Sequence, residues 1–298
     1  MTVRVVVIGA GQFGTEHLRA YSMMPDVEIV GVMDADPVRA RDVADRFETV
    51  ALEPGPINAD AVSLVVPVHA RGALATELLA LGGTALFIEK PLAASTAVAG
   101  QLERAAHGRV AMVGHVVRFA EPYRRLADAS RGAPLSGHLS RRRSADHAVA
   151  YPSEDVIGLT MIHDLDAATW IAGSRPTSVS ATGDRSADGR WTRCRAELRH
   201  RDGSEWVVEA EWSGDSGDQE DRARVQGPAG EVSLVITAAE ADTVYGDALV
   251  AELDHFIDHV RSGTPSQVLR MGDAAFAVTL ADAVRASLEQ EGASVDLS

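Results

Sequence analysis

Hydrophobic and polar positions follow two different patterns in this chain, and the change comes near residue 118. In the first part, short β-branched runs alternate with stretches of helical periodicity. Continuous apolar runs of this kind are typical of strands that are buried on both faces of a parallel sheet. The expected strands are 3–8, 27–33, 61–66, 85–88 and 109–113, and the expected helices are 15–24, 37–47, 70–81 and 95–106. The repeated strand–helix order predicts an α/β domain with a parallel sheet and helices on both faces.

Beyond residue 118 the pattern favours longer strands that are joined by turns. These strands are expected at 136–144, 176–183, 190–200, 204–213, 220–227 and 231–237. Asp202-Gly203 is a strong hairpin signal, and Gly227-Pro228-Ala229-Gly230 indicates another turn. The expected helices are 157–172, 247–262 and 271–290. Together they predict an α+β domain with a large, mostly antiparallel open sheet and helices packed on one side.

A glycine motif, Gly9-Ala10-Gly11-Gln12-Phe13-Gly14, joins the first expected strand to the first expected helix. In this context Gly9 allows the turn, Gly11 lets the backbone approach a pyrophosphate, and Gly14 lets helix and strand pack closely. The pyrophosphate would lie on the helix N-terminus, where free N–H groups and the helix dipole favour anions. The motif therefore predicts a dinucleotide-binding Rossmann domain, and a simple tight turn is the alternative.

Asp34 ends the second expected strand, 20 residues after Gly14. That spacing suits a carboxylate that binds the ribose 2′-hydroxyl of the dinucleotide. Because a carboxylate repels a 2′-phosphate, the residue favours NAD over NADP. Arg39 and Arg41 lie close enough in sequence to leave NADP open, and the alternative role for Asp34 is to cap the next helix.

Lys90 is the single lysine of the chain, although lysine and arginine together number 28. It lies in Glu89-Lys90-Pro91, directly after the strand 85–88, and the carboxyl ends of parallel strands face the ligand crevice. Pro91 restricts the backbone of Lys90. A fixed ammonium beside a nicotinamide can bind a substrate oxygen and pass the proton that accompanies hydride transfer. The alternative is a surface salt bridge with Glu89, but an arginine would serve there, and only lysine releases a proton usefully.

Two further motifs follow the glycine motif and Glu89-Lys90-Pro91, namely Gly114-His115-Val116-Val117-Arg118-Phe119 and Met161-Ile162-His163-Asp164-Leu165-Asp166. On these four motifs the sequence resembles the glucose–fructose oxidoreductase / inositol dehydrogenase / MocA family of NAD(P)-dependent oxidoreductases, and the resemblance covers essentially the whole chain. It implies a Rossmann domain, here 1–118, and a substrate-binding and oligomerisation domain, here 119–298. It also implies a sugar, sugar derivative or cyclitol as substrate, and a homodimer or homotetramer formed through the C-terminal sheet.

The same resemblance assigns roles to individual residues. Lys90 and His163 match the family's catalytic lysine and histidine, and Arg118 and Asp166 match substrate-binding positions. An arginine in the pocket would suit a substrate with a carboxylate or phosphate. The expected cofactor-binding residues are Gly9, Gly11, Gln12, Phe13, Gly14, Asp34, Pro67, Glu89 and Lys90.

Two positions depart from the family pattern. Leu159 stands four residues before His163, where the family usually has an aspartate that orients the imidazole. Arg71 stands four residues after Pro67, where a histidine is common, and His69 lies nearby.

The loss of the aspartate leaves three interpretations open. His163 works with Lys90 alone; or the protein binds cofactor and ligand with little turnover; or another carboxylate replaces the missing one, the candidates being Asp164, Asp155 and Asp146. A histidine that only packs or caps the helix is the non-functional alternative.

Charge and composition narrow the classes of partner. The formal net charge of -15 disfavours nucleic acid, and the short cluster Arg141–Arg143 is best interpreted as part of a solvated or salt-bridged strand. The single cysteine, Cys194, cannot form an internal disulfide. Gly9 comes too early for a signal peptide, and no apolar run is long enough for a membrane span. We expect a soluble, cytoplasmic protein with no metal site and no membrane or nucleic-acid partner.

These observations predict an NAD-dependent oxidoreductase that transfers a hydride between nicotinamide and a hydroxyl or carbonyl carbon of a polyol-type substrate. The alternative is a catalytically weak or inactive dinucleotide-binding sensor on the same scaffold, which Leu159 favours. Reduction of an imine or another non-sugar substrate is a third possibility.

Overall fold

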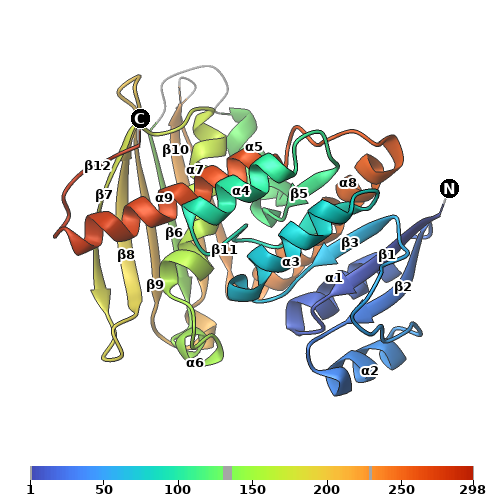
Figure 1. The fold of residues 1–298 in the computed structure, drawn as a ribbon. Coiled ribbons are helices and arrows are strands. Elements are labelled where there is room, and N and C mark those ends of the chain that lie inside the picture. Colours follow the sequence, from blue (N-terminus) through green and yellow to red (C-terminus); the bar gives the residue numbers. More distant parts are fainter. Residues whose placement is uncertain (1, 130–135, 228–229, 298) are drawn as a thin grey trace. The chain divides into compact units, whose positions relative to one another are not determined.

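The computed structural model describes residues 2–129, 136–227 and 230–297. The chain divides into two compact units, each built from two segments (Figure 1). The first unit combines Met1–Val116 with Asp247–Phe276, and the second combines Val117–Gly246 with Ala277–Ser298. The inclusion of Asp247–Phe276 in the first unit has no counterpart in the sequence pattern.

The first unit contains a five-stranded parallel sheet in the order β2-β1-β3-β4-β5. Its strands are β1 (Val3–Ile8), β2 (Val27–Met33), β3 (Ala61–Leu64), β4 (Ala85–Ile88) and β5 (Ala111–Val113). Every residue of β3, β4 and β5 is buried, as expected for strands that are covered on both faces. The predicted parallel sheet is confirmed.

The helices of this unit begin where local chemistry favours a helix start. They are α1 (Gln12–Ser22), α2 (Pro37–Arg46), α3 (Val68–Leu81) and α4 (Thr96–Ala105), and the last two lie side by side (Figure 1). Asp36 caps α2 by accepting from the N–H groups of Val38 and Arg39, and Pro37 occupies its first turn. The predicted start of α1 at Thr15 was three residues too late, because the glycine motif itself enters the first turn.

The second unit contains a seven-stranded sheet in the order β11-β10-β6-β9-β8-β7-β12. All neighbouring strands are antiparallel except β6 and β9, so the predicted, mostly antiparallel sheet is confirmed. The strands are β6 (Ser136–Arg143), β7 (Ser178–Arg185), β8 (Trp191–Arg199), β9 (Glu205–Trp212), β10 (Glu220–Gly227), β11 (Gly230–Thr237) and β12 (Val295–Asp296).

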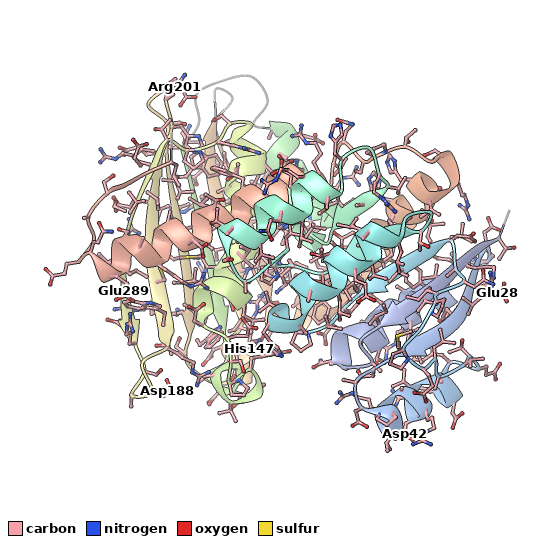
Figure 2. The ribbon with its side chains drawn as sticks, viewed as in Figure 1. Glu28, Asp42, His147, Asp188, Arg201 and Glu289 are labelled. Carbon is pink, nitrogen blue, oxygen red and sulfur yellow. The ribbon has the colours of Figure 1, made fainter. Side chains whose placement is uncertain are left out.

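Two tight connections fix the register of β8. Figure 2 labels Asp188 and Arg201 in the turns that enter and leave this strand. Gly203 of the predicted hairpin has φ +86°, the conformation that this turn requires and that glycine adopts without strain. Pro228 and Ala229 of the other predicted turn lie outside the described residues.

The remaining helices include several that the sequence pattern missed. A 3₁₀ turn (Val116–Phe119), α5 (Glu121–Ala129) and the short α6 (Asp146–Ala150) had no prediction. The predicted helix 157–172 consists of a π-helix (Ile157–Met161) followed by α7 (Ile162–Ala172), which packs on β6 and β9. The last two helices are α8 (Ala238–Ser262), which starts nine residues before its predicted start, and α9 (Met271–Glu289).

Candidate active site

The glycine turn between β1 and α1 is shaped by very close backbone contacts. Gly9 has φ +108°, and a Cβ there would lie 2.3 Å from the carbonyl oxygen of Val65. A Cβ on Gly14 would lie 1.8 Å from the carbonyl oxygen of Gly9. A Cβ on Gly11, by contrast, would meet nothing within 4 Å. The first and third glycines are therefore required for packing, whereas the second borders open space.

The N-terminus of α1 has the features of an anion site. Gly11 is the N-cap, the helix has no side-chain cap, and its first turn holds no acidic residue. The first N–H groups of a helix have no partner within the helix, so this end of α1 favours an anion through hydrogen bonding and through the helix dipole. Gln12 and Phe13 are exposed at the same place.

Asp34 follows β2 and turns back to the glycine motif. Its carboxylate accepts from the backbone N–H of Ala10 at 2.7 Å and from that of Asp36 at 2.8 Å, and it pairs with Arg39 at 2.7 Å. Burial alone would raise the pKa of Asp34, but these hydrogen bonds outweigh it and hold the pKa below its usual value. The alternative role as a helix cap is wrong, because Asp36 caps α2.

The turn after β4 carries Glu89 and Lys90. The Glu89 carboxylate accepts from the backbone N–H of Lys90 at 3.0 Å and lies 3.1 Å from His17 Nε2 on α1. Burial would raise the pKa of Glu89, but the contact with His17 and the positive charges of Lys90 and Arg71 lower it. Glu89 is only 6% exposed, so the surface salt bridge considered above does not describe this carboxylate. Lys90 is partly buried, and the Lys90–Pro91 peptide bond is cis.

Arg71, on α3, supports the same turn from another direction. Its buried guanidinium donates to the backbone carbonyl of Val66 at 2.6 Å and to that of Pro91. It thereby links the loop after β3, which includes Pro67 at the N-cap of α3, to the loop after β4. From the sequence, Arg71 was recognisable only as a departure from the family pattern, and His17 was not predicted at all. The signal for each was a basic residue in a helix that packs on the sheet.

His163 lies in the first turn of α7, directly after the π-helix, and is partly buried. Two side chains fix the π-helix: Asp155 accepts from the N–H of Gly158 at 2.8 Å, and Trp212 Nε1 donates to Thr160 at 2.8 Å. Single π-helical turns within helices are common at functional sites. Leu159 belongs to this π-helix.

Two of the three carboxylates that were candidates to replace the missing aspartate are bound by arginines. Asp164 is fully buried, and both its oxygens accept from Arg141 at 2.9 Å. Asp155 pairs in the same bidentate way with Arg285 on α9, at 3.0 and 2.8 Å. Asp146 is exposed at the start of α6.

Arg118 and Asp166, the two predicted substrate-binding residues, bind each other. Arg118 Nε and Nη2 donate to the two oxygens of Asp166 at 2.8 and 2.6 Å, and the residues are 5% and 2% exposed. The guanidinium carbon also lies 5.9 Å from the ring centre of Trp170 on α7. The charges of the pair cancel locally, which weakens the case for an anionic substrate.

The predicted residues thus form one group in each unit. The first unit brings together the glycine turn, Asp34 and the Glu89–Lys90 turn, and the second places Arg118 and Asp166 on and beside the helix of His163. Over residues 2–129, 136–227 and 230–297, no cluster of three or more His, Cys, Asp or Glu side chains is arranged to hold a metal ion. Within the same ranges, no helix combines the length and apolar character needed to cross a membrane.

Two family models match the chain. Residues 3–115 match the "Oxidoreductase family, NAD-binding Rossmann fold", and residues 105–233 match the "GFO/IDH/MocA C-terminal domain". This chain belongs to the GFO/IDH/MocA oxidoreductase family. The family resemblance, the Rossmann fold and the NAD-binding domain that the sequence predicted are thereby confirmed.

Individual members of the GFO/IDH/MocA family show how far the likeness extends. An inositol 2-dehydrogenase of Acidothermus cellulolyticus is 30% identical over 200 residues, which is 62% of this chain and 58% of that relative. The match therefore spans less than two thirds of the relative's length. The myo-inositol dehydrogenase of Lactobacillus casei, solved with NAD(H) and myo-inositol, has a TM-score of 0.85 at 24% identity over 100% of this chain and 97% of its own. The myo-inositol 2-dehydrogenase of Lactobacillus plantarum has a TM-score of 0.89 at 17% identity, covering 100% of both chains. At these identities the two structures support the fold.

Proposed function

We propose that this member of the GFO/IDH/MocA family is an NAD-dependent oxidoreductase that acts on a hydroxyl-bearing carbon of a cyclitol or a related sugar. The observation that carries the proposal is the placement of the only lysine. Glu89 holds the backbone of Lys90 and, through His17, ties it to the helix that begins at the glycine turn. The relative named as an inositol 2-dehydrogenase supports a cyclitol as the substrate class.

The residues of the first unit bind the cofactor and one oxygen of the substrate in this proposal. Bound NAD supplies the hydride acceptor. Gly9, Gly11, Gln12, Phe13 and Gly14 hold its pyrophosphate, with Pro67 and Glu89 beside them. Asp34 accepts hydrogen bonds from the adenosine ribose. The Lys90 ammonium donates a hydrogen bond to the substrate oxygen and stabilises negative charge that develops on it.

On the second unit, His163 accepts the hydroxyl proton as the carbonyl forms. Arg118 and Asp166 shape the site as a neutral pair, because each cancels the charge of the other. A neutral polyol therefore suits this site better than a carboxylate or phosphate ester.

The decisive experiment is a spectrophotometric screen of inositol stereoisomers and sugars with NAD⁺ and NADP⁺. We expect nicotinamide reduction with at least one cyclitol, and faster with NAD⁺. Lys90→Ala should abolish turnover while NADH affinity stays within ~3-fold, since binding energy at the pyrophosphate is separate from chemistry. Glu121→Gln, at an exposed position of α5, is the matched control. A Lys90→Ala variant with full turnover would refute the assignment.

One observation favours a second candidate, a dinucleotide-binding sensor with little turnover. Leu159 replaces the family aspartate, and Asp164 and Asp155 are both held by arginines. The substitution Leu159→Asp separates the two functions. An enzyme limited by the missing carboxylate should gain ~10-fold or more in kcat, whereas a sensor should bind NADH and stay inactive with every polyol.

We also propose, on the sequence and the family resemblance, that the protein acts in the cytoplasm as a homodimer or homotetramer. The proposed domain ranges are 1–118 and 119–298. The proposed assembly surface is the open face of the second sheet, where β8 exposes Arg193, Glu197 and Arg199 and buries the alternate residues.

A further inference from the structure

His17 is a fully buried histidine that the proposed chemistry does not use. It lies on α1, three residues after Gly14, and is 0% exposed. Its Nε2 lies 3.1 Å from Glu89 Oε1, across 72 residues of sequence. Its Nδ1 has no hydrogen-bond partner among the described residues.

The direction of the His17–Glu89 hydrogen bond follows from the carboxylate. The pKa of Glu89 is lowered, against its burial, by His17 and nearby cations, so the group is ionised and can only accept. Nε2 of His17 therefore carries the hydrogen and donates it to Oε1. The other oxygen, Oε2, accepts from the backbone N–H of Lys90 at 3.0 Å. One carboxylate thus connects α1 to the lysine turn.

The surroundings leave this carboxylate little freedom. A Cβ on Gly114 would lie 2.9 Å from Glu89 Oε1 and 2.9 Å from the Phe87 ring. The Phe87 ring in turn meets the imidazole of His17 edge-on, with 5.5 Å between ring centres. The absence of a side chain at residue 114 makes room for Glu89, and Phe87 and His17 enclose it.

A packing role alone does not account for His17. A phenylalanine would fill the same space against Phe87 and Tyr21 without burying a ring nitrogen, Nδ1, that lacks a partner. Buried polar atoms without partners are destabilising, so their presence suggests that another atom of the same ring is needed. That atom is Nε2.

We infer that His17 is a positioning residue for Lys90. Acting through Glu89, it couples the N-terminal helix of the dinucleotide site to the lysine turn, so that NAD binding at α1 also fixes the place of the ammonium. The inference extends the proposed function by naming what aligns the lysine.

The single lysine allows a direct test on the full-length chain. Protein labelled with ¹³C at the lysine Cε gives one side-chain resonance, which belongs to Lys90. Wild-type protein, His17→Phe and His17→Gln are each titrated with NADH. We expect NADH to shift the resonance in the wild type and in His17→Gln, because the glutamine amide can still donate to Glu89. In His17→Phe, which keeps the ring and loses the donor, the shift should fall by at least half.

Kinetics with the best substrate from the screen provide the second measurement. His17→Phe should lower kcat by ~10–100-fold, as expected for a misplaced catalytic group, with KM and NADH affinity changed less than ~3-fold. His17→Gln should stay within ~3-fold of the wild type. Glu16→Gln, on the exposed side of the same helix, is the control and should match the wild type in both measurements.

A purely structural role predicts the reverse order, with His17→Phe tolerated and His17→Gln impaired, and that result would overturn the inference. So would an unchanged Lys90 resonance response in His17→Phe. If His17→Phe does not fold, Gly114→Ala tests the same link, because its methyl group displaces the Glu89 carboxylate and should also weaken the response. The resonance measurement requires no turnover. A protein without activity would therefore refute the proposed function, and the Lys90 resonance would still test the link from His17 to Lys90.

Discussion

Asp34 and Arg39 are the two side chains that we expect to decide between NAD and NADP. The carboxylate binds the glycine turn through the N–H of Ala10, and the guanidinium pairs with it at 2.7 Å. Arg41 instead donates to the backbone carbonyl of Pro37. We therefore expect Asp34 to repel a 2′-phosphate and to occupy the arginine that would otherwise attract one.

Replacing Asp34 with serine should reverse the cofactor preference. The serine still offers a hydroxyl to the turn, while Arg39 becomes available to a 2′-phosphate. We expect NADH to bind ~10-fold more weakly and NADPH ~10-fold more tightly, in line with one gained or lost charge-assisted hydrogen bond. Fluorescence titration with both cofactors measures the change, and Asp34→Ser/Arg39→Ala should bind neither well. Unchanged discrimination in Asp34→Ser would remove Asp34 from the cofactor site.

Glu89 should give the protein a specific loss of stability in acid. Its folded pKa lies below its unfolded value, so its stabilising contribution is present above the unfolded pKa and is lost as pH falls through the folded pKa. Glu89→Gln should cost about 1–3 kcal/mol at pH 7, because His17 and the Lys90 N–H lose a charged acceptor. Denaturant unfolding at pH 7 and pH 3 should show this difference shrinking at the lower pH. The exposed Glu121→Gln should change stability by less than about 0.5 kcal/mol at both pH values.

Residues with a known offset from a motif were predictable from sequence, whereas residues defined by long-range contacts were not. Asp34 follows Gly14 at the spacing that the fold requires, and Lys90 stood out as the single lysine. His17 and Arg71 gained their roles only when the chain brought them to Glu89 and Pro91, 72 and 20 residues away. No local pattern encodes such a pair.

Among elements, the strand–turn–helix that begins the chain contains two glycines that its packing requires, Gly9 and Gly14, and a third, Gly11, that we propose for cofactor binding. Gly11→Ala should fold normally, since its backbone has φ -70° and its Cβ would meet nothing within 4 Å. We expect a melting temperature within about 2 °C of the wild type, because exposed substitutions change stability little, and NADH binding weakened by ~10-fold or more, because the methyl occupies the space beside the pyrophosphate.

Gly9→Ala and Gly14→Ala are the matched comparison within the same turn. Each would place a Cβ within 2.3 Å of a backbone oxygen, that of Val65 for Gly9 and that of Gly9 for Gly14, so the backbone must shift in both variants. Both should lower stability by at least ~3 kcal/mol, as overpacking against backbone does. Calorimetry of the three variants gives the comparison, and a Gly11→Ala protein that binds NADH normally would contradict the assigned anion site.

Elements with a strong period were predicted well, and short or irregular ones were not. The runs 3–8, 27–33 and 85–88 became strands with the predicted bounds, because short, mostly apolar runs between turn signals are typical of strands in a parallel sheet. The five-residue α6 carries too few residues for a period to show. The π-helix before α7 differs from an α-helix only in its hydrogen-bond register, which side-chain patterns do not report.

For the whole molecule, the division of the chain into two units of two segments each could not be predicted from the sequence. It depends on the return of Asp247–Phe276 to the first unit, more than 100 residues after that unit's first segment ends.

Net charge, in contrast, is a property of the whole chain that the sequence supplies directly. A net charge of -15 opposes the approach of a second copy. A stable homo-oligomer therefore needs a face on which positive and negative side chains balance.

The second sheet provides such a face. A hollow of about 410 Å³ on it is lined by five arginines and four carboxylates among other residues. Arg142 lies there between Glu220 and Glu211 on the two neighbouring strands and forms an ion pair with Glu211. The alternation along neighbouring strands lets a second copy related by two-fold symmetry meet unlike charges, as an isologous interface requires.

Arg142→Glu should break this balance by placing three carboxylates in line across three strands. Light scattering after gel filtration should give a multiple of 31.5 kDa for the wild type. Sedimentation should show that the dissociation constant of the variant oligomer is ~10-fold or more above that of the wild type. Arg125→Glu, at an exposed position of α5, applies the same charge change elsewhere and should leave the assembly intact. If both variants keep the wild-type mass at low micromolar concentration, the open sheet is not the assembly surface. In that case the paired charges serve only to keep the open face of the sheet hydrated. Each cross-strand ion pair on it then contributes about 0.2–1 kcal/mol to the stability of the sheet.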